Sequence, residues 1–118
     1  NTLLIQIEQA VRGFPRYHKY TIGTELRTQA MRVVRLLSRA IKQSDGRHTW
    51  VKRAHDAVDD LKIQIQLAKE LKAFHSFRQY QQIAELSFGV SRQAMGWQNK
   101  LQRTPSEKRG QGRNGVQP

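Results

Sequence analysis

Apolar residues recur along most of this chain with the period of an α-helix, and they predict four helical segments. We expect helices over residues 1–13, Thr21–Gln43, about Thr49–Phe77 and about Gln79–Gln102. No segment of useful length alternates apolar and polar residues as a β-strand does. Because short connections join the four segments, the pattern favours an all-α fold, an antiparallel four-helix bundle formed by residues 1–103.

The segment Thr21–Gln43 has two chemically different faces when successive residues are placed about 100° apart. The aliphatic face, which we expect in the core, holds Leu26, Ala30, Val33, Val34, Leu36, Leu37, Ala40 and Ile41. The opposite face holds Arg32, Arg35, Arg39 and Lys42, and Glu25 is the one acid of the segment. Like charges at this spacing repel each other, and arginine suits bidentate contact with phosphate. The pattern therefore favours contact with a polyanion over a merely solvated face.

Charge and composition narrow the function classes. Lysine and arginine number 21 against nine acidic residues, which gives a net charge of +12. Such an excess attracts nucleic acid or an anionic membrane surface, and we favour nucleic acid. The chain contains no cysteine, so disulfides and thiolate zinc sites are excluded. It shows no apolar run long enough to span a membrane and no signal-peptide pattern, and we expect a cytoplasmic location. Residues 104–118 read as a flexible basic tail.

Basic residues outside the segment Thr21–Gln43 extend the candidate set. The connector after Phe14-Pro15 interleaves Arg16 and Lys19 with Tyr17 and Tyr20. This interleaving can bind nucleic acid through stacking and phosphate contacts. We expect Arg16 and Lys19 to contact phosphate, but we favour the alternative that the two tyrosines close the end of the bundle. The full set of predicted nucleic-acid contacts is Arg16, Lys19, Arg27, Arg32, Arg35, Arg39, Lys42, Arg92, Lys100 and Arg103.

The third segment carries a second apolar stripe, formed by Ile63, Leu67, Leu71 and Phe74. A helix with two apolar sides usually packs against two neighbours. The second neighbour is either inside the same bundle or in another subunit or partner, and the sequence leaves both interpretations open. In the fourth segment, Gly89 and Gly96 interrupt the helical pattern, and we expect another helix or backbone to approach closely there.

Residues suited to catalysis are scarce. The chain has no glycine-rich phosphate loop, and its four histidines lack the spacing of a metalloprotease motif. Asp56, Asp59 and Asp60 form one acidic cluster, which we interpret as a surface ion-pair network with Lys52 and Arg53. The alternative is a metal-dependent nuclease built on Asp56 and Asp60. We therefore expect a binding protein rather than an enzyme, without a metal or another cofactor.

Three passages resemble a known family of small bacterial four-helix-bundle proteins. They are the aromatic, proline and basic run Phe14–Gly23, the stretch Leu67–Leu71, and Gln79-Tyr80 together with Gly96-Trp97. This family includes the bundle encoded in intervening sequences of bacterial 23S ribosomal RNA genes. It also includes the accessory variability determinant (Avd) of diversity-generating retroelements, and Gly-Trp near the end points to that branch. The resemblance covers about residues 3–102.

The resemblance implies a homopentameric, barrel-like bundle without an active site of its own. Such a protein would bind RNA or DNA and the retroelement reverse transcriptase, and would support mutagenic synthesis of cDNA from a template RNA. The alternative is a bundle of the 23S rRNA intervening-sequence type that acts as a protein-interaction scaffold, with its basic surface docking an acidic partner. Competition between nucleic acid and that partner would separate the two.

Overall fold

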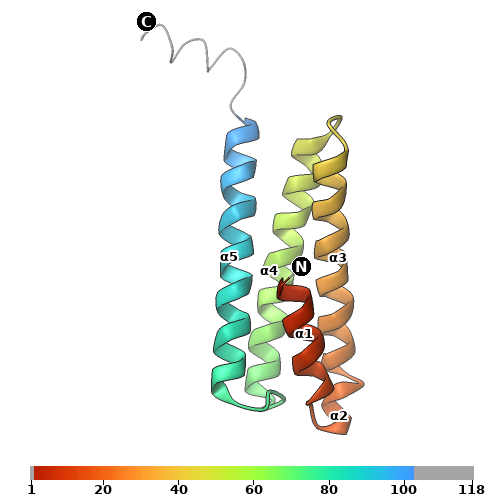
Figure 1. Cartoon of the computed structure of the whole chain (residues 1–118), viewed down its shortest axis with the longest axis vertical. Helices are drawn as coiled ribbons and strands as arrows, with labels where there is room; N and C mark the ends of the chain where they lie inside the picture. Colours follow the sequence, from red (N-terminus) through yellow and green to blue (C-terminus); the bar gives the residue numbers. More distant parts are fainter. Residues whose placement is uncertain (1, 103–118) are drawn as a thin grey trace, which may run out of the picture.

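A computed structural model of the chain confirms the all-α prediction, and the structure describes residues 2–102. Four helices pack side by side as α1 (Thr2–Arg12), α3 (Ile22–Lys42), α4 (Arg47–Glu70) and α5 (Phe77–Gln102), and a single turn, α2 (Arg16–Lys19), joins the first two (Figure 1). The sequence predicted the four long segments but treated α2 as a connector. Within the described residues, no helix combines the length and the apolarity needed to cross a membrane.

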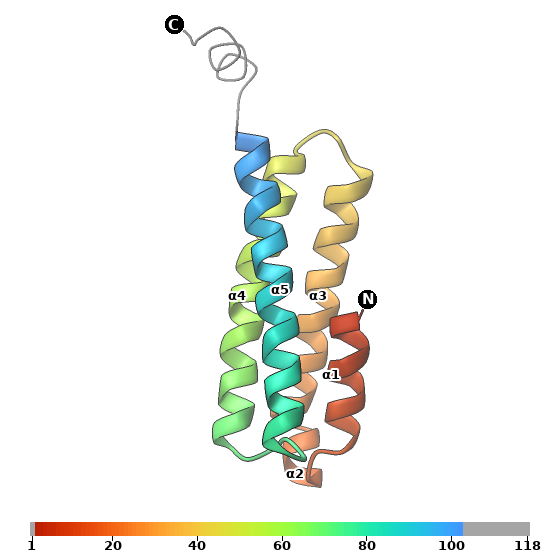
Figure 2. The same ribbon diagram turned by 60° about the vertical axis from the view of Figure 1, so that its left-hand side comes forward.

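The core lies between the four long helices, and each of them contributes to it. Ile7, Leu26, Leu61 and Ile83, one from each helix, are almost fully buried in a single cluster. Helix α4 packs on both α3 and α5, and α1 packs on α3 and α5 from the other side. Helices α3 and α5 therefore occupy opposite corners of the bundle (Figure 2).

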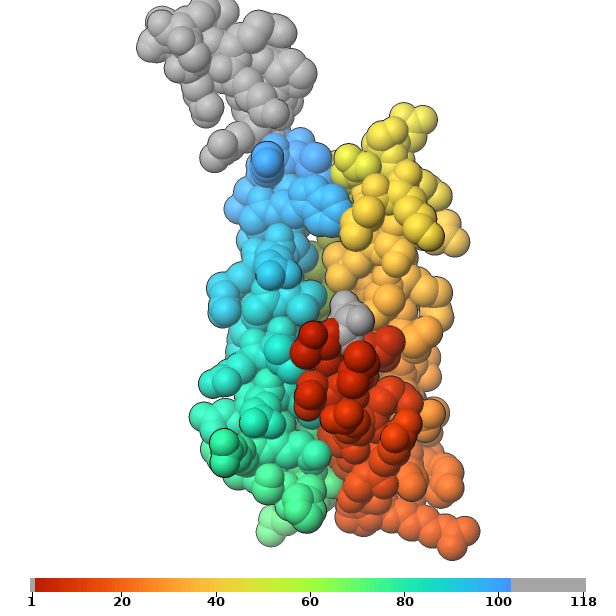
Figure 3. All heavy atoms as spheres, viewed as in Figure 1, coloured from red at the N-terminus to blue at the C-terminus, as the bar shows by residue number. Residues whose placement is uncertain are grey.

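Helix α1 is short and covers only about half the length of α3 and α5 (Figure 1). Beyond its first turn the surface is hollowed between α3 and α5 (Figure 3). This arrangement overturns one core prediction, because Ile41 is 65% exposed. Ile41 follows Gly23 by five helical turns and so points to the same side of α3. Gly23 lies against Val11 of α1 and against Phe14, which follows α1. Ile41 lies further along α3, where α1 no longer covers it.

Two helix boundaries differ from the prediction for identifiable reasons. Helix α4 ends at Glu70 rather than near Phe77 because Lys72 adopts a left-handed conformation, with φ of 59°. The Lys72 N–H then bonds to the Lys69 carbonyl, and the Ala73 N–H bonds to the Ala68 carbonyl. This is the Schellman pattern of a helix end. Helix α5 begins at Phe77, and Ser76 Oγ accepts a hydrogen bond from the Gln79 N–H.

Candidate nucleic-acid interface

The outward face of α3 is basic and open. Arg32, Arg35 and Lys42 are exposed, and none of them pairs with a carboxylate among the residues that the structure describes. The amphipathic pattern of α3 explains this arrangement, since Leu26, Ala30 and Val33 occupy the buried side. We define Arg32, Arg35, Arg39 and Lys42 as the α3 basic stripe. Its guanidinium groups are available to an anion from solution.

Arg39, the third member of the stripe, is exposed but held by an aromatic ring. Its Cζ atom lies 5.0 Å from the centroid of the Trp50 ring on α4, and Arg53 Cζ lies 5.1 Å from the same centroid. Cation–π contacts of this kind orient a guanidinium group without neutralising its charge. The Trp50 ring therefore contacts two guanidinium groups, that of Arg39 on α3 and that of Arg53 on α4. The sequence analysis assigned Arg53 to an ion-pair network rather than to the nucleic-acid contacts, although its position three residues after Trp50 on one helix was a usable signal.

Arg27 differs from the stripe because it has a partner. Its Nε atom donates to Glu8 Oε1 of α1 at 2.6 Å. Both side chains are partly exposed, so the pair adds little stability. It nevertheless cancels the local positive charge. Arg27 is therefore a poorer candidate for nucleic-acid contact than the sequence pattern indicated.

The remaining predicted contacts lie away from the stripe. Arg16 is exposed and Lys19 is half-buried, both on α2 at the end of the bundle. Arg92 and Lys100 are exposed on α5, at the corner opposite α3. The structure thus separates the predicted residues into three groups rather than one continuous surface. Arg103 and the predicted tail lie outside the described residues.

Arg47, which the sequence analysis did not select, serves the fold. Its Nε atom donates to the Ala40 carbonyl at 2.7 Å, and its Nη2 atom donates to the Ile41 carbonyl at 3.0 Å. These carbonyls belong to the last turn of α3, where helix carbonyls lack partners within the helix. Arg47 thereby ties the first residue of α4 to the end of α3.

Tyr17 of α2 and Tyr20, which follows α2, do not close the end of the bundle, so that prediction is wrong. Tyr17 is 75% exposed and Tyr20 is 69% exposed. Phe14 and Phe74 fill that place instead, with ring centroids 5.3 Å apart in an edge-to-face arrangement. Since Phe14 is buried and Phe74 half-buried, the core at this end is complete without the tyrosines.

An apolar groove lies on the outer side of the α4–α5 pair. Ile63, Leu67 and Leu71, three of the four residues of the second stripe, are exposed, and so is Phe88 of α5. The groove has a volume of about 440 Å³, and its lining includes Ile63, Leu67 and Phe88 together with the charged residues Lys62 and Glu70. Phe74 belongs elsewhere, because its ring packs against Phe14 and Tyr80 within the chain. We therefore restrict the α4 apolar stripe to Ile63, Leu67 and Leu71.

The acidic cluster of α4 forms ion pairs, but with other partners than those predicted. Lys62 Nζ lies 3.1 Å from Asp59 Oδ1, and His55 Nδ1 lies 3.7 Å from Asp59 Oδ2. Asp56 Oδ1 lies 4.0 Å from the same histidine nitrogen. His55, Asp56 and Asp59 could together offer three metal ligands. However, all three residues lie on one helix, and the Asp59 carboxylate is already paired with the Lys62 ammonium group.

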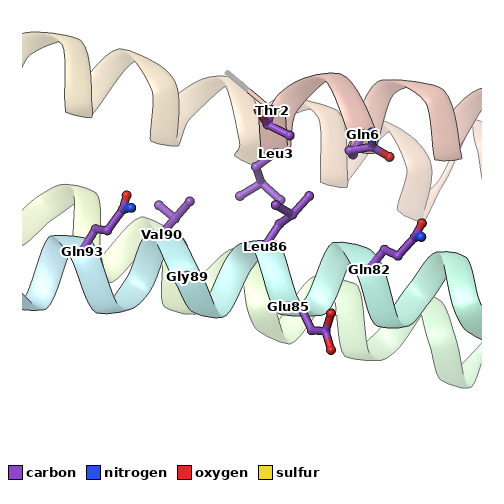
Figure 4. Close-up of a pocket in the computed structure, with 9 residues that line it drawn as sticks. All are labelled: Thr2, Leu3, Gln6, Gln82, Glu85, Leu86, Gly89, Val90 and Gln93. Carbon is purple, nitrogen blue, oxygen red and sulfur yellow. The ribbon is translucent and has the colours of Figure 1, made fainter.

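A second groove, of about 670 Å³, separates α1 from α5. Leu3 and Leu86 point toward each other across it, and Gln6, Gln82 and Gln93 line its sides (Figure 4). Gly89 lies at its margin, where an added Cβ would meet only the Arg92 side chain, at 4.0 Å; at Gly96 it would meet nothing within 4 Å. The expected close approach to these glycines is therefore absent within the described residues.

Comparison with known proteins identifies a family to which the chain is similar. Residues 1–101 match the model of a protein family described as bAvd-like. The match covers nearly all of the helical part of the chain. No curated protein and no solved structure matches the chain.

Proposed function

Because the chain belongs to the bAvd-like family, we propose that it is an accessory subunit of a diversity-generating retroelement. Members of this family are generally non-catalytic accessory proteins. In our proposal the protein associates with the retroelement reverse transcriptase and its template RNA, and supports mutagenic synthesis of cDNA. It contributes binding surfaces to this reaction, and the reverse transcriptase performs the chemistry.

The α3 basic stripe is the observation that carries the nucleic-acid part of the proposal. Its four side chains are exposed on one helix face, and no carboxylate among residues 2–102 pairs with them. A row of unpaired guanidinium groups binds phosphates through charge-assisted hydrogen bonds, without reading sequence. We therefore propose that α3 follows a nucleic-acid backbone, with Trp50 keeping Arg39 and Arg53 oriented.

The α4 apolar stripe supports a second part of the proposal, self-association. Ile63 and Leu67 expose apolar surface in the same groove as Phe88, Leu71 is exposed further along α4, and apolar patches of this kind mark protein contacts. We propose that copies of the chain assemble through this groove, as a homopentamer in keeping with the family resemblance. Helix α3 occupies another corner of the bundle, so such an assembly would leave the α3 basic stripe facing outward.

Reconstitution of cDNA synthesis tests the proposal. The reverse transcriptase and the template RNA of a retroelement would be incubated with and without the protein. We expect template-primed cDNA only when the protein is present. The Arg32→Glu/Arg35→Glu variant should support much less synthesis, because reversed charges repel phosphate. The Lys52→Glu/Lys72→Glu variant changes the net charge equally outside the stripe and should remain active. Equal synthesis without the protein would contradict the proposed function.

A further inference from the structure

Two exposed tyrosines lie at α2, Tyr17 within it and Tyr20 directly after its last residue, and the proposed function has not used them. Tyr17 and Tyr20 are the most exposed large apolar side chains among the described residues. They lie three residues apart, as do Arg16 and Lys19 beside them. The single turn α2 and the residue that follows it therefore carry two aromatic rings and two cations within five consecutive residues. Residues three apart on a helix have Cβ atoms about 5–6 Å from each other.

The turn that carries these side chains is held firmly between α1 and α3. Thr21 Oγ1 donates to the Tyr17 carbonyl at 2.9 Å, and the Lys19 N–H bonds to the Pro15 carbonyl at 2.8 Å. The Tyr17 ring meets the His18 ring edge-on, with centroids 5.5 Å apart. At Gly23 an added Cβ would lie 3.0 Å from the His18 carbonyl, so α3 approaches α2 closely. The exposure of the tyrosines is thus a property of an ordered turn.

The charge around the tyrosines favours one kind of ligand. Between Glu8 and Glu25 the chain carries Arg12, Arg16 and Lys19 and no acid. A second copy of this basic end would be repelled. The ligand must offer flat surfaces to the tyrosine rings and negative charge to the cations. Single-stranded nucleic acid does both, because its unpaired bases stack on aromatic rings and its phosphates attract the adjacent cations. A duplex does not, since its base faces are covered by neighbouring base pairs.

We propose that Tyr17 and Tyr20 form a stacking platform for single-stranded nucleic acid, with Arg16 and Lys19 contacting the phosphates of the same strand. This inference rests on the proposed nucleic-acid binding but places a second, chemically different contact at the end of the bundle. The α3 basic stripe attracts any backbone, whereas the platform selects strands whose bases are unpaired.

Binding of fluorescein-labelled oligouridylate and of an RNA duplex of equal length tests the platform. The Tyr17→Ala/Tyr20→Ala variant should bind the single strand about tenfold or more weakly than the unchanged protein, because each stacked base contributes substantially. Its duplex affinity should stay within twofold. The Tyr17→Phe/Tyr20→Phe variant, which keeps the rings, should bind both ligands normally. Thermal unfolding by circular dichroism should be unchanged, since both side chains are exposed.

Three results would overturn the platform. The alanine variant could bind the single strand as tightly as the unchanged protein, lose duplex binding equally, or bind normally while sedimenting as a smaller assembly. The last result would make the tyrosines a protein contact. If the unchanged protein bound neither ligand, the proposed nucleic-acid binding itself would fail. Normal duplex binding with no effect of the tyrosines would remove the platform alone.

Discussion

Gly23 is the residue whose size most directly limits how closely α1, α2 and α3 approach. An alanine Cβ there would lie 2.9 Å from Val11 Cγ1 and 3.0 Å from the His18 carbonyl oxygen. We expect Gly23→Ala to lower the free energy of unfolding by about 1–3 kcal/mol, because the backbones must separate. Urea denaturation followed by circular dichroism measures this change.

Gly96 provides the matched control, since it lies inside a helix but faces open space. Gly96→Ala should raise the free energy of unfolding by about 0.5–1 kcal/mol, through reduced freedom of the unfolded chain. Destabilisation by Gly96→Ala comparable with that of Gly23→Ala would show that another chain packs closely at Gly96 and would contradict this account.

The arginines show what a sequence leaves open at the scale of residues. The spacing on α3 correctly predicted that Arg32, Arg35 and Arg39 are exposed, because helical geometry alone decides the face. It did not distinguish Arg27 from Arg32 and Arg35, because the partner of Arg27 is Glu8, 19 residues away on another helix. Tertiary pairing of this kind depends on how α1 lies against α3. The exposure of Tyr17 and Tyr20 depended equally on Phe14 and Phe74 meeting at that end.

Among the elements, the junction of α3 and α4 depends on Arg47. Its two hydrogen bonds to the Ala40 and Ile41 carbonyls connect the two helices across the turn. We expect Arg47→Ala to lower the free energy of unfolding by about 1–2 kcal/mol, because carbonyls at the end of α3 lose a charged donor. Chemical denaturation would measure the free energy of unfolding, and Lys52→Ala, a substitution at an exposed residue of α4, would serve as the control. Equal stability of both variants would contradict this role.

A helix end was predicted well where glycine and proline follow the helix, and poorly where another residue type takes the place of glycine. The predicted end at residue 13 lies within one residue of the end of α1 at Arg12. The end of α4 was missed because Lys72, rather than glycine, takes the left-handed position of its Schellman motif. The start of α5 had a usable signal in Ser76 and Gln79, which resemble a capping box. Here Gln79 Oε1 accepts from the His75 N–H.

At the scale of the whole molecule, the α4 apolar stripe leads to a prediction about assembly. Leu67→Lys places a charge in the apolar groove and should convert the proposed oligomer into monomers. Analytical ultracentrifugation measures the mass directly. Met31→Lys, a change of the same kind at an exposed residue of α3, should leave the assembly intact. An unchanged mass for Leu67→Lys would remove this groove as the subunit interface.

The central claim is that the α3 basic stripe holds a nucleic-acid backbone, and the salt dependence of binding tests it most directly. Affinity for duplex DNA would be measured by fluorescence anisotropy at several salt concentrations. For Arg32→Glu/Arg35→Glu we expect at least about tenfold weaker binding and a salt slope smaller by about two units, because two phosphate contacts are lost. The slope should be preserved in Lys52→Glu/Lys72→Glu. Identical slopes for the unchanged protein and the stripe variant would contradict the account.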